Sequence, residues 1–252
     1  MARTVLTNEQ WNKLKPILLQ LNIYNKHNLK DTVEGILYRM RTGIAWRDLP
    51  SNFGKANTIY KTFLRWSKFN KIMKLFKKLA TKADKEWLFI DGSYVKAHQH
   101  ACNISDQNQQ GVGKSVAGNT SKIHLMVDAH GNPIDFIITG GQVHDVKIAP
   151  QLIKQNDLTH TEILSADKGY DCEHLREQIQ QTQTQPNIPK KSNSQTKDHS
   201  MDWYMYKVRH LVENAFMKIK KFRAVATRYD KLLVCYQSTV AFACICQWVK
   251  LL

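Results

Sequence analysis

Four polar residues in the C-terminal third have the types and the spacing to bind a metal ion or a phosphate group: Tyr206, Arg209, Glu213 and Lys220. In a helix, at about 100° per residue, all four fall within an arc of about 60°. The opposite face is apolar and consists of Val208, Leu211, Val212, Ala215, Ile219 and Phe222. The polar face is either a solvated surface with favourable charge pairs or a metal-binding carboxylate beside phosphate-binding cations.

Two aspartates are candidates to meet Glu213. Asp91 ends the apolar run WLFID and Asp167 ends the run ILSAD, and both runs are typical of strands that are buried on both faces. Ligand sites of open α/β sheets gather beyond the ends of such strands. Each aspartate alone could simply cap the turn that follows it. As a set with Glu213, the two predict a site for hard divalent cations, since Mg²⁺ prefers a few carboxylates and keeps places for substrate phosphates.

The positive charge is concentrated at the N-terminus. Of the net charge of +16, residues 1–85 contribute +13, with 18 basic and 5 acidic residues, and residues 86–252 contribute +3. This distribution indicates a polyanionic partner for the N-terminal third.

The N-terminal residues predict a small all-α module. Thr7 and Gln10 form a capping box at the start of one helix, and Asp31 and Glu34 form a related pattern at the start of a second helix that ends at Gly43. Two further amphipathic helices follow. Residues 49–83 contain nine basic residues and no acidic one, which favours a helix-turn-helix-like DNA-binding module over a merely solvated basic surface.

From residue 87 the pattern changes and predicts a mixed sheet covered by helices. The expected elements, in order, are a strand ending at Asp91, a long polar loop at 98–121, a hairpin around 130–132, a helix at 145–156, a strand ending at Asp167, a helix at 172–183, a short strand at 185–189 and a helix at 201–222. The apolar stretch 232–252 contains polar residues and predicts a buried terminal helix, not a membrane span.

Several other motifs suggest chemistry without the context for it. The segment 111–115 (GVGKS) resembles the end of a phosphate loop, but no strand leads into it, and the segment 98–102 (HQHAC) has no second cluster to complete a zinc site. His144-Asp145 resembles a catalytic dyad, yet helix capping is the simpler interpretation of Asp145. Of the hairpin aspartates Asp128 and Asp135, we expect turn chemistry for one and a surface position for the other. The five cysteines have no framework spacing and indicate reduced thiols, and the N-terminus lacks the apolar core of a signal peptide.

The spacing of the first four residues resembles a known signature. Tyr206, Arg209, Glu213 and Lys220 match the Y-(2)-R-(3)-E-(6)-K motif of bacterial insertion-sequence transposases of the DDE type. Further segments resemble the same family, in particular its branch called insertion sequence five, over about residues 46–230: WRDLP, FLRW, FIDGSYVKAH, SKIHLMVDAHGNPI, GQVHD, ADKGYD, IPKKSN and ATRYDK.

This resemblance implies a ribonuclease-H-like catalytic domain at 86–252, preceded by the basic helical DNA-binding domain at 1–85. It assigns Asp91, Asp167 and Glu213 as catalytic residues that hold two Mg²⁺ ions, for which Mn²⁺ can substitute. The DNA-binding residues that we expect are Tyr206, Arg209, Lys220, Lys122, Arg47, Lys61 and Arg65.

The activity implied is two-metal-ion phosphoryl transfer, in which the protein cleaves the ends of an insertion element and joins the freed 3′-OH to target DNA. The expected partners are double-stranded DNA, as terminal inverted repeats and target, and at least one further copy of the chain. The expected location is the bacterial cytoplasm, in association with the nucleoid and without a membrane. Two alternatives stay open: a ribonuclease-H-like nuclease that cuts without joining, and a DNA-binding regulator without catalysis.

Overall fold

The computed structural model describes residues 4–102, 110–192, 194 and 201–251. Contacts between residues divide the chain into two compact units. The first comprises Met1–Leu79, Ala97–Ser105 and Lys218–Leu252, and the second comprises Ala80–Lys96 and Asp106–Met217.

The N-terminal part of the first unit is helical, as expected. Its elements are α1 (Asn8–Gln20), α2 (Leu29–Thr42), two short 3₁₀ turns (Trp46–Asp48 and Ser51–Phe53), α3 (Ala56–Lys68) and α4 (Lys71–Ala80). The capping box at the start of α1 is confirmed, because Thr7 and Gln10 each accept a backbone N–H from the other. Gly43 ends α2 in the left-handed conformation, with φ of 72°, as expected of a helix C-terminus.

The expected start of α2 at Asp31 is wrong. The helix begins at Leu29, and Glu34 lies inside it, where its side chain is buried. Its carboxylate accepts the N–H of Val5 at 2.7 Å and that of Leu6 at 2.9 Å. The Glu34 carboxylate therefore accepts hydrogen bonds from backbone N–H groups about 28 residues away in sequence and does not cap its own helix.

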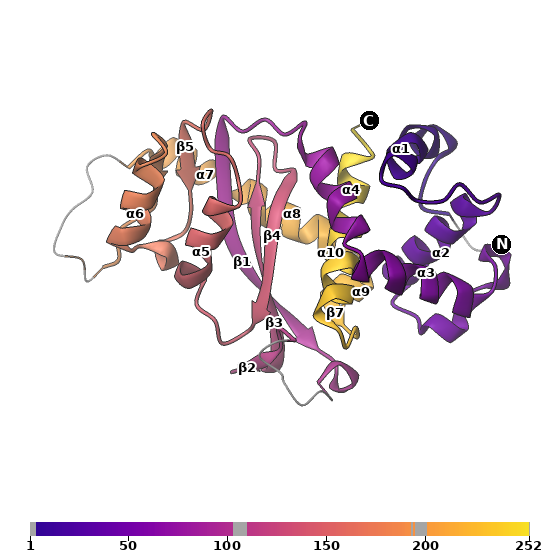
Figure 1. Cartoon of the computed structure of the whole chain (residues 1–252). Helices are drawn as coiled ribbons and strands as arrows, with labels where there is room; N and C mark the ends of the chain where they lie inside the picture. The colour runs from indigo at the N-terminus through magenta and orange to yellow at the C-terminus, as the bar shows by residue number, and fades with distance from the viewer. Residues whose placement is uncertain (1–3, 103–109, 193, 195–200, 252) are drawn as a thin grey trace. The chain divides into compact units, whose positions relative to one another are not determined.

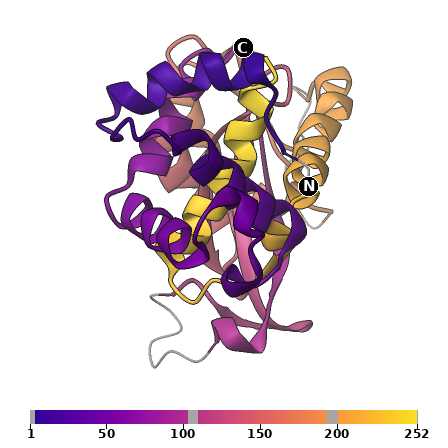
Figure 2. The ribbon, with the colours of Figure 1, turned by 90° about the vertical axis from the view of Figure 1, so that its right-hand side faces the viewer.

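The C-terminal residues of the first unit pack with its N-terminal helices. α9 (Arg223–Ala226) contacts α2, and α10 (Leu233–Trp248) contacts α2, α3 and α9, so that α10 runs among the N-terminal helices in Figure 2. Nearly all of α10 is buried, which confirms the terminal helix expected from the sequence. The division of the sequence at residue 85 differs from this grouping, since packing joins residues 218–252 to the N-terminal helices.

Within the described parts of the chain, no helix combines the length and the apolar character that crossing a membrane requires.

The second unit is built on a mixed sheet. Its strands are β1 (Trp87–Ala97), β2 (Gly113–Ser115), β3 (Gly118–Val127), β4 (Pro133–Gly140), β5 (Ile163–Ser165) and β6 (Gln185–Asn187). The order is β2-β3-β1-β5-β6, and β4 also pairs with β3. The pairs that β3 makes with β1, β2 and β4 are antiparallel, whereas β5 is parallel to both β1 and β6. The predicted mixed α/β sheet is thus confirmed.

Helices lie on both faces of this sheet (Figure 1). α5 (Asp145–Lys154) packs on β3 and β4, and α6 (Glu173–Gln180) packs on β6 and against α5. The helix expected over 201–222 is divided into α7 (Trp203–Val208) and α8 (His210–Lys220). The junction at Arg209 is tightened by two bonds between residues three apart, from Arg209 N–H to the Tyr206 carbonyl and from Val212 N–H to the Arg209 carbonyl.

Two expected strand boundaries are corrected. β1 does not end at Asp91 but continues to Ala97, because the residues from Asp91 to Lys96 pair with β3. β3 begins at Gly118, so the end of the loop expected at 98–121 is strand, whereas residues 103–109 lie outside the described residues.

The two hairpin aspartates behave differently. Asp128 accepts the N–H groups of His130 at 3.0 Å and Asn132 at 2.7 Å, which confirms its role in the turn. The surface position expected for the other aspartate is wrong, because Asp135 is 2% exposed. Its carboxylate is satisfied inside the unit by the Phe136 N–H and the Asn156 amide, each at 2.8 Å.

Candidate active site

Asp91 lies in the middle of β1, at a position where its carboxylate is held from two sides. Oδ1 accepts the N–H of Gly92 at 2.7 Å, and Oδ2 is 3.2 Å from Nη1 of Arg209. Burial raises the pKa of Asp91, and the charges of Asp167 and Asp145 raise it further, against the lowering effects of the Gly92 N–H and Arg209. The net rise in the pKa of Asp91 shows that burial, with the smaller effects of the two carboxylates, outweighs the Gly92 N–H and Arg209.

Asp167 follows β5 and lies near Asp91. Its carboxylate accepts the N–H of Gly169 at 2.8 Å, which starts a short 3₁₀ helix. The turn is braced by Asp171, whose carboxylate pairs with Arg176 at 3.0 Å. Capping and proximity to Asp91 therefore coexist at Asp167, since its charge acts on the pKa of Asp91 while its Oδ1 caps the turn.

Arg209 links Asp91 to Glu213. Its Nη2 is 2.6 Å from Oε1 of Glu213, one helical turn further on, while its Nη1 contacts Asp91. Its guanidinium also lies 5.8 Å from the centre of the Tyr206 ring. Burial would lower the pKa of Arg209, but Asp91 and Glu213 outweigh it and raise that pKa. Carboxylates from β1 and α8 thus meet at one guanidinium.

The start of α7 is fixed to the edge of the sheet, which sets the position of Arg209. The Asn187 side chain of β6 accepts the Asp202 N–H and donates to the Asp202 carbonyl, both at 3.0 Å. The Asp202 carboxylate in turn caps α7 by accepting the Met205 N–H at 2.9 Å.

The donor set suits a hard divalent cation. Asp91, Asp167 and Glu213 offer only carboxylate oxygens, the ligands that Mg²⁺ prefers, and burial raises the pKa of Asp91, so a cation beside it would favour its charged form. Among the residues that the structure describes, no three His, Cys, Asp or Glu side chains are grouped tightly enough to hold a metal ion, and Arg209 stands between two of the three carboxylates.

The other residues expected to bind DNA differ in exposure. Arg47, Lys61 and Arg65, in the first unit, are exposed. Lys220, the last residue of α8, is half-buried, and burial lowers the pKa of its ammonium group. Lys122 is only 4% exposed. Its ammonium pairs with Asp145, whereas the sequence predicted a contact with DNA at the surface.

Sequence reasoning did not predict the roles of three further residues, Asp145, His124 and Tyr170. The Asp145 side chain does not cap α5 but pairs with Lys122 and His124. The preceding residue, His144, makes no side-chain capping bond either. Burial would raise the pKa of Asp145, but His124 and Lys122 outweigh it and lower that pKa. Tyr170 is fully buried, and burial together with the charges of Asp145, Asp91 and Asp167 raises its pKa well above the ordinary value. Asp145 lies in the segment GQVHD and His124 in the segment SKIHLMVDAH, but no local pattern indicates that the two residues meet.

As far as the described residues go, the remaining motifs form no further group that could hold a metal ion. Residues 113–115 of the GVGKS segment form β2 and not a loop that leads into a helix. His98 accepts the His100 N–H at 3.3 Å and stacks on that ring. No disulfide joins the five cysteines, all of which lie among the described residues.

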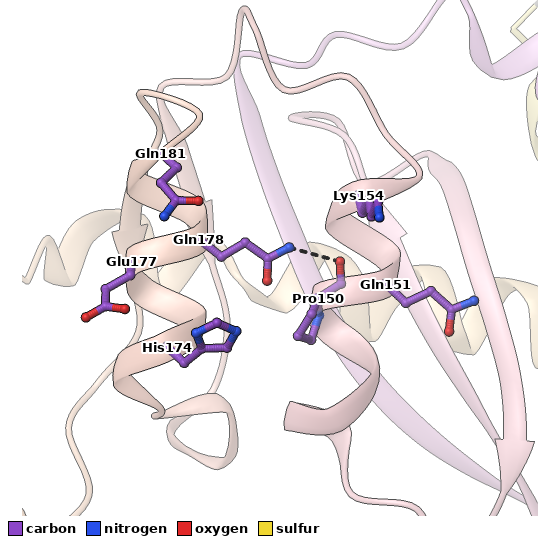
Figure 3. Close-up of a pocket in the computed structure, with 7 residues that line it drawn as sticks. All are labelled: Pro150, Gln151, Lys154, His174, Glu177, Gln178 and Gln181. Atoms are coloured by element: carbon purple, nitrogen blue, oxygen red, sulfur yellow. Dashed lines mark hydrogen bonds between the residues drawn. The ribbon is translucent and has the colours of Figure 1, made fainter.

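A groove of about 470 Å³ lies between α5 and α6 (Figure 3), and none of Asp91, Asp167 and Glu213 lines it. Most of the residues that line it have polar side chains, and the Gln178 amide donates to the Pro150 carbonyl at 3.2 Å across it. The residues that line it are Pro150, Gln151, Lys154, His174, Glu177, Gln178 and Gln181.

The fold and a family model identify the class of protein to which the chain belongs. Among solved structures, the "piggyBac transposase synaptic complex with hairpin DNA" aligns with a TM-score of 0.52 at 11% sequence identity, over 96% of this chain and 72% of that one. The family model "Transposase DDE domain" matches residues 82–234, which is more than half of the chain. The chain therefore belongs to the DDE transposase family, with the ribonuclease-H-like fold and the metal-dependent cleavage and transfer of DNA strands that define this family.

Within that family the chain is similar to transposases of bacterial insertion elements. A second family model, "Putative transposase of IS4/5 family", matches residues 6–76. The "Putative transposase for insertion sequence element IS6501" of Brucella ovis is 32% identical over 131 residues, which are 52% of this chain and 99% of that protein. The "Transposase for insertion sequence element IS1106" of Neisseria meningitidis serogroup B is 31% identical over 133 residues, 49% of this chain, and the match spans 44% of that protein.

Proposed function

We propose that this chain cleaves the ends of its own insertion element and joins the freed 3′-OH to target DNA, with Asp91, Asp167 and Glu213 as the catalytic, metal-binding carboxylates. The observation that carries the proposal is the bridge made by Arg209, which contacts both Asp91 and Glu213 while the charge of Asp167 acts on Asp91. Carboxylates of β1 and α8 thus meet at one guanidinium, and a third carboxylate, after β5, acts on the first, which supports the proposal.

The three carboxylates would hold two Mg²⁺ ions, for which Mn²⁺ can substitute, and these ions would supply charge stabilisation and an activated oxygen nucleophile. The protein's own groups prepare the site for them. The Gly92 N–H orients the Asp91 carboxylate, and the Asn187–Asp202 pair fixes α7 and hence Arg209. The forked guanidinium of Arg209 has the geometry to bind a phosphate oxygen once its carboxylate partners bind cations.

The basic helices of the first unit would bind double-stranded DNA, both at the terminal inverted repeats of the element and at the target. Their exposed side chains include Arg47, Lys61 and Arg65, and residues 49–83 contain no acidic residue. Because two ends must be processed together, we propose that at least two copies of the chain assemble on DNA. The site of action would be the bacterial cytoplasm at the nucleoid.

The test is incubation of the full chain with Mg²⁺ and DNA that carries the terminal inverted repeats of its element. Joined products are the expected result. Cut ends without joining would indicate a nuclease, and a mobility shift without cleavage would indicate a regulator. Either of those outcomes would contradict the proposed function.

Arg209→Lys tests the bridge at the centre of the site. A lysine keeps one positive charge but cannot contact Asp91 and Glu213 with separate nitrogens, so we expect cleavage to fall by about ten- to a hundredfold. Binding to end DNA, measured by fluorescence anisotropy, should change by less than about twofold, because bulk affinity comes from the basic helices. Equal losses in cleavage and in binding would show that Arg209 contributes only charge.

Lys61→Ala and Arg65→Ala test the basic helices. Each variant should weaken DNA binding and reduce the slope of log K against log salt concentration by about one, since each removes one phosphate contact. Lys13→Ala is a matched control, because Lys13 is a basic residue of α1 whose ammonium pairs with Glu9 at 3.0 Å. An unchanged slope in both test variants would place the DNA elsewhere on the chain.

A further inference from the structure

A buried charged cluster lies beside β1 and has no part in the function proposed so far. The Lys122 ammonium pairs with Oδ2 of Asp145, and His124 Nδ1 lies 2.9 Å from Oδ1 of the same carboxylate. The other ring nitrogen of His124 is 2.8 Å from the Thr139 hydroxyl. The side chains of Lys122 and His124 are 5% and 2% exposed. The Asp145 carboxylate thereby joins the first residue of α5 to β3, and the His124 ring joins β3 to β4.

This cluster rests directly on Gly92. A Cβ atom at Gly92 would lie 1.9 Å from Oδ1 of Asp145 and 2.8 Å from Cε of Lys122. Real Cβ atoms do not approach other atoms so closely, and the Asp145 carboxylate has little freedom to retreat because Lys122 and His124 hold it. The chain needs glycine at this position for space and not for an unusual φ.

Gly92 also holds the candidate catalytic carboxylate. Its N–H donates to Oδ1 of Asp91 at 2.7 Å. Successive side chains of a strand point to opposite faces, so Asp91 points to the face of Arg209 while the open side of Gly92 points to Asp145. The register supports this arrangement, because Gly92 pairs with His124, and Tyr94 pairs with Lys122. Gly92 therefore lies against Asp145 and Lys122 on one face of β1, and its N–H orients the Asp91 carboxylate, which points to the other face.

We propose that Lys122, His124 and Asp145 form a positioning cluster that holds Gly92 in place and thereby sets the position of the Asp91 carboxylate for cation binding. The inference rests on the proposed function of Asp91. Lys122 balances the charge of Asp145, so the cluster adds a rigid brace without adding net negative charge to a site that already contains three carboxylates. This role also differs from the DNA contact expected of Lys122 from the sequence.

The experiment compares Asp145→Asn with a double variant that combines Lys122→Met and Asp145→Asn. The single variant keeps the shape of the side chain over Gly92 but leaves the Lys122 charge buried without its partner, so it can lose stability. The double variant removes both charges and avoids that loss. Asp135→Asn is the matched control, since Asp135 is another buried carboxylate of the same sheet with no contact to Gly92 among those of the described residues.

Three quantities are measured for each protein: kcat for cleavage of end DNA, the Kd for that DNA, and the Mn²⁺ concentration that half-saturates the DNA-free protein, followed by electron paramagnetic resonance. In the double variant we expect kcat to fall, and the half-saturating Mn²⁺ concentration to rise, by about ten- to a hundredfold, with the DNA Kd changed by less than about threefold. In the control all three quantities should stay within about threefold of wild type.

Two results would overturn the inference. One is a double variant with the kcat and the Mn²⁺ affinity of the control, which would make the cluster merely structural. The other is a loss of DNA affinity at unchanged kcat, which would make Lys122 a DNA contact. Failure of the proposed function looks different: the wild-type protein would not cleave end DNA, while Mn²⁺ binding that still depended on Asp91 and on the cluster would support the positioning role.

Discussion

Asp91→Asn, Asp167→Asn and Glu213→Gln are each expected to lower cleavage and joining of element ends by at least about a thousandfold, because loss of one charged metal ligand removes about 4 kcal/mol of transition-state stabilisation. The three substitutions keep the size of the side chain and remove its charge. The measurement is a single-turnover cleavage assay in Mg²⁺ with labelled end DNA, followed by a strand-transfer assay on the same samples.

Binding to the same DNA should persist in all three variants, since the affinity comes mainly from basic residues elsewhere on the chain. Glu177→Gln is a suitable control: Glu177 is an exposed helical glutamate of α6, in the groove of Figure 3, and its substitution should leave cleavage unchanged. Normal nicking by any one of the three variants would remove that residue from the catalytic set.

The second large effect is expected for the stability of the first unit. The Asp230 carboxylate is 3.3 Å from Nη2 of Arg39 and accepts the Thr239 hydroxyl at 2.8 Å. Both charged side chains are almost fully buried, at 5% and 6% exposure, and Nε and Nη1 of Arg39 have no hydrogen-bond partner within the described part of the chain. Asp230→Ala leaves this guanidinium buried without its counter-charge, so we expect the free energy of unfolding to fall by about 3–5 kcal/mol.

Urea denaturation of wild type and variant provides the measurement. Adding Arg39→Met to Asp230→Ala should restore part of the loss, because the buried charge is then gone as well. Glu9→Gln is the control, since it breaks an exposed pair with Lys13, and it should change stability by less than about 0.5 kcal/mol. A loss below about 1 kcal/mol for Asp230→Ala would show that water or a structural rearrangement compensates Arg39.

Much of the local structure follows from the sequence alone. The capping box at Thr7, the left-handed Gly43, the turn at Asp128 and the apolar run that forms β1 are each encoded within a few residues, where capping geometry and side-chain period act directly. The spacing from Tyr206 to Lys220 placed Arg209 and Glu213 on one face, and the structure joins them at 2.6 Å. The family that this motif indicates is confirmed by the matches over residues 6–76 and 82–234.

Errors arose where a distant segment decides what a residue does. Glu34 has the spacing of a helix-start residue but binds the backbone of Val5 and Leu6, and Asp135 has the polarity of a surface residue but is buried against Asn156. β1 continues beyond Asp91 because β3 pairs with it there. In each case a partner outside the local window satisfies a polar group, and propensity carries no information about that partner.

The sequence by itself determined which residue types were present for phosphoryl transfer, where the positive charge lies and which segments form strands or helices, because these depend on composition and short-range period. Only the tertiary structure decided that Arg209 bridges Asp91 and Glu213, and that Lys122 turns inward to Asp145 over Gly92. The physical reason is that these contacts are set by sheet register and by the docking of α5, α7 and α8 on the sheet. They join residues up to 118 positions apart, and no periodicity along the chain encodes them.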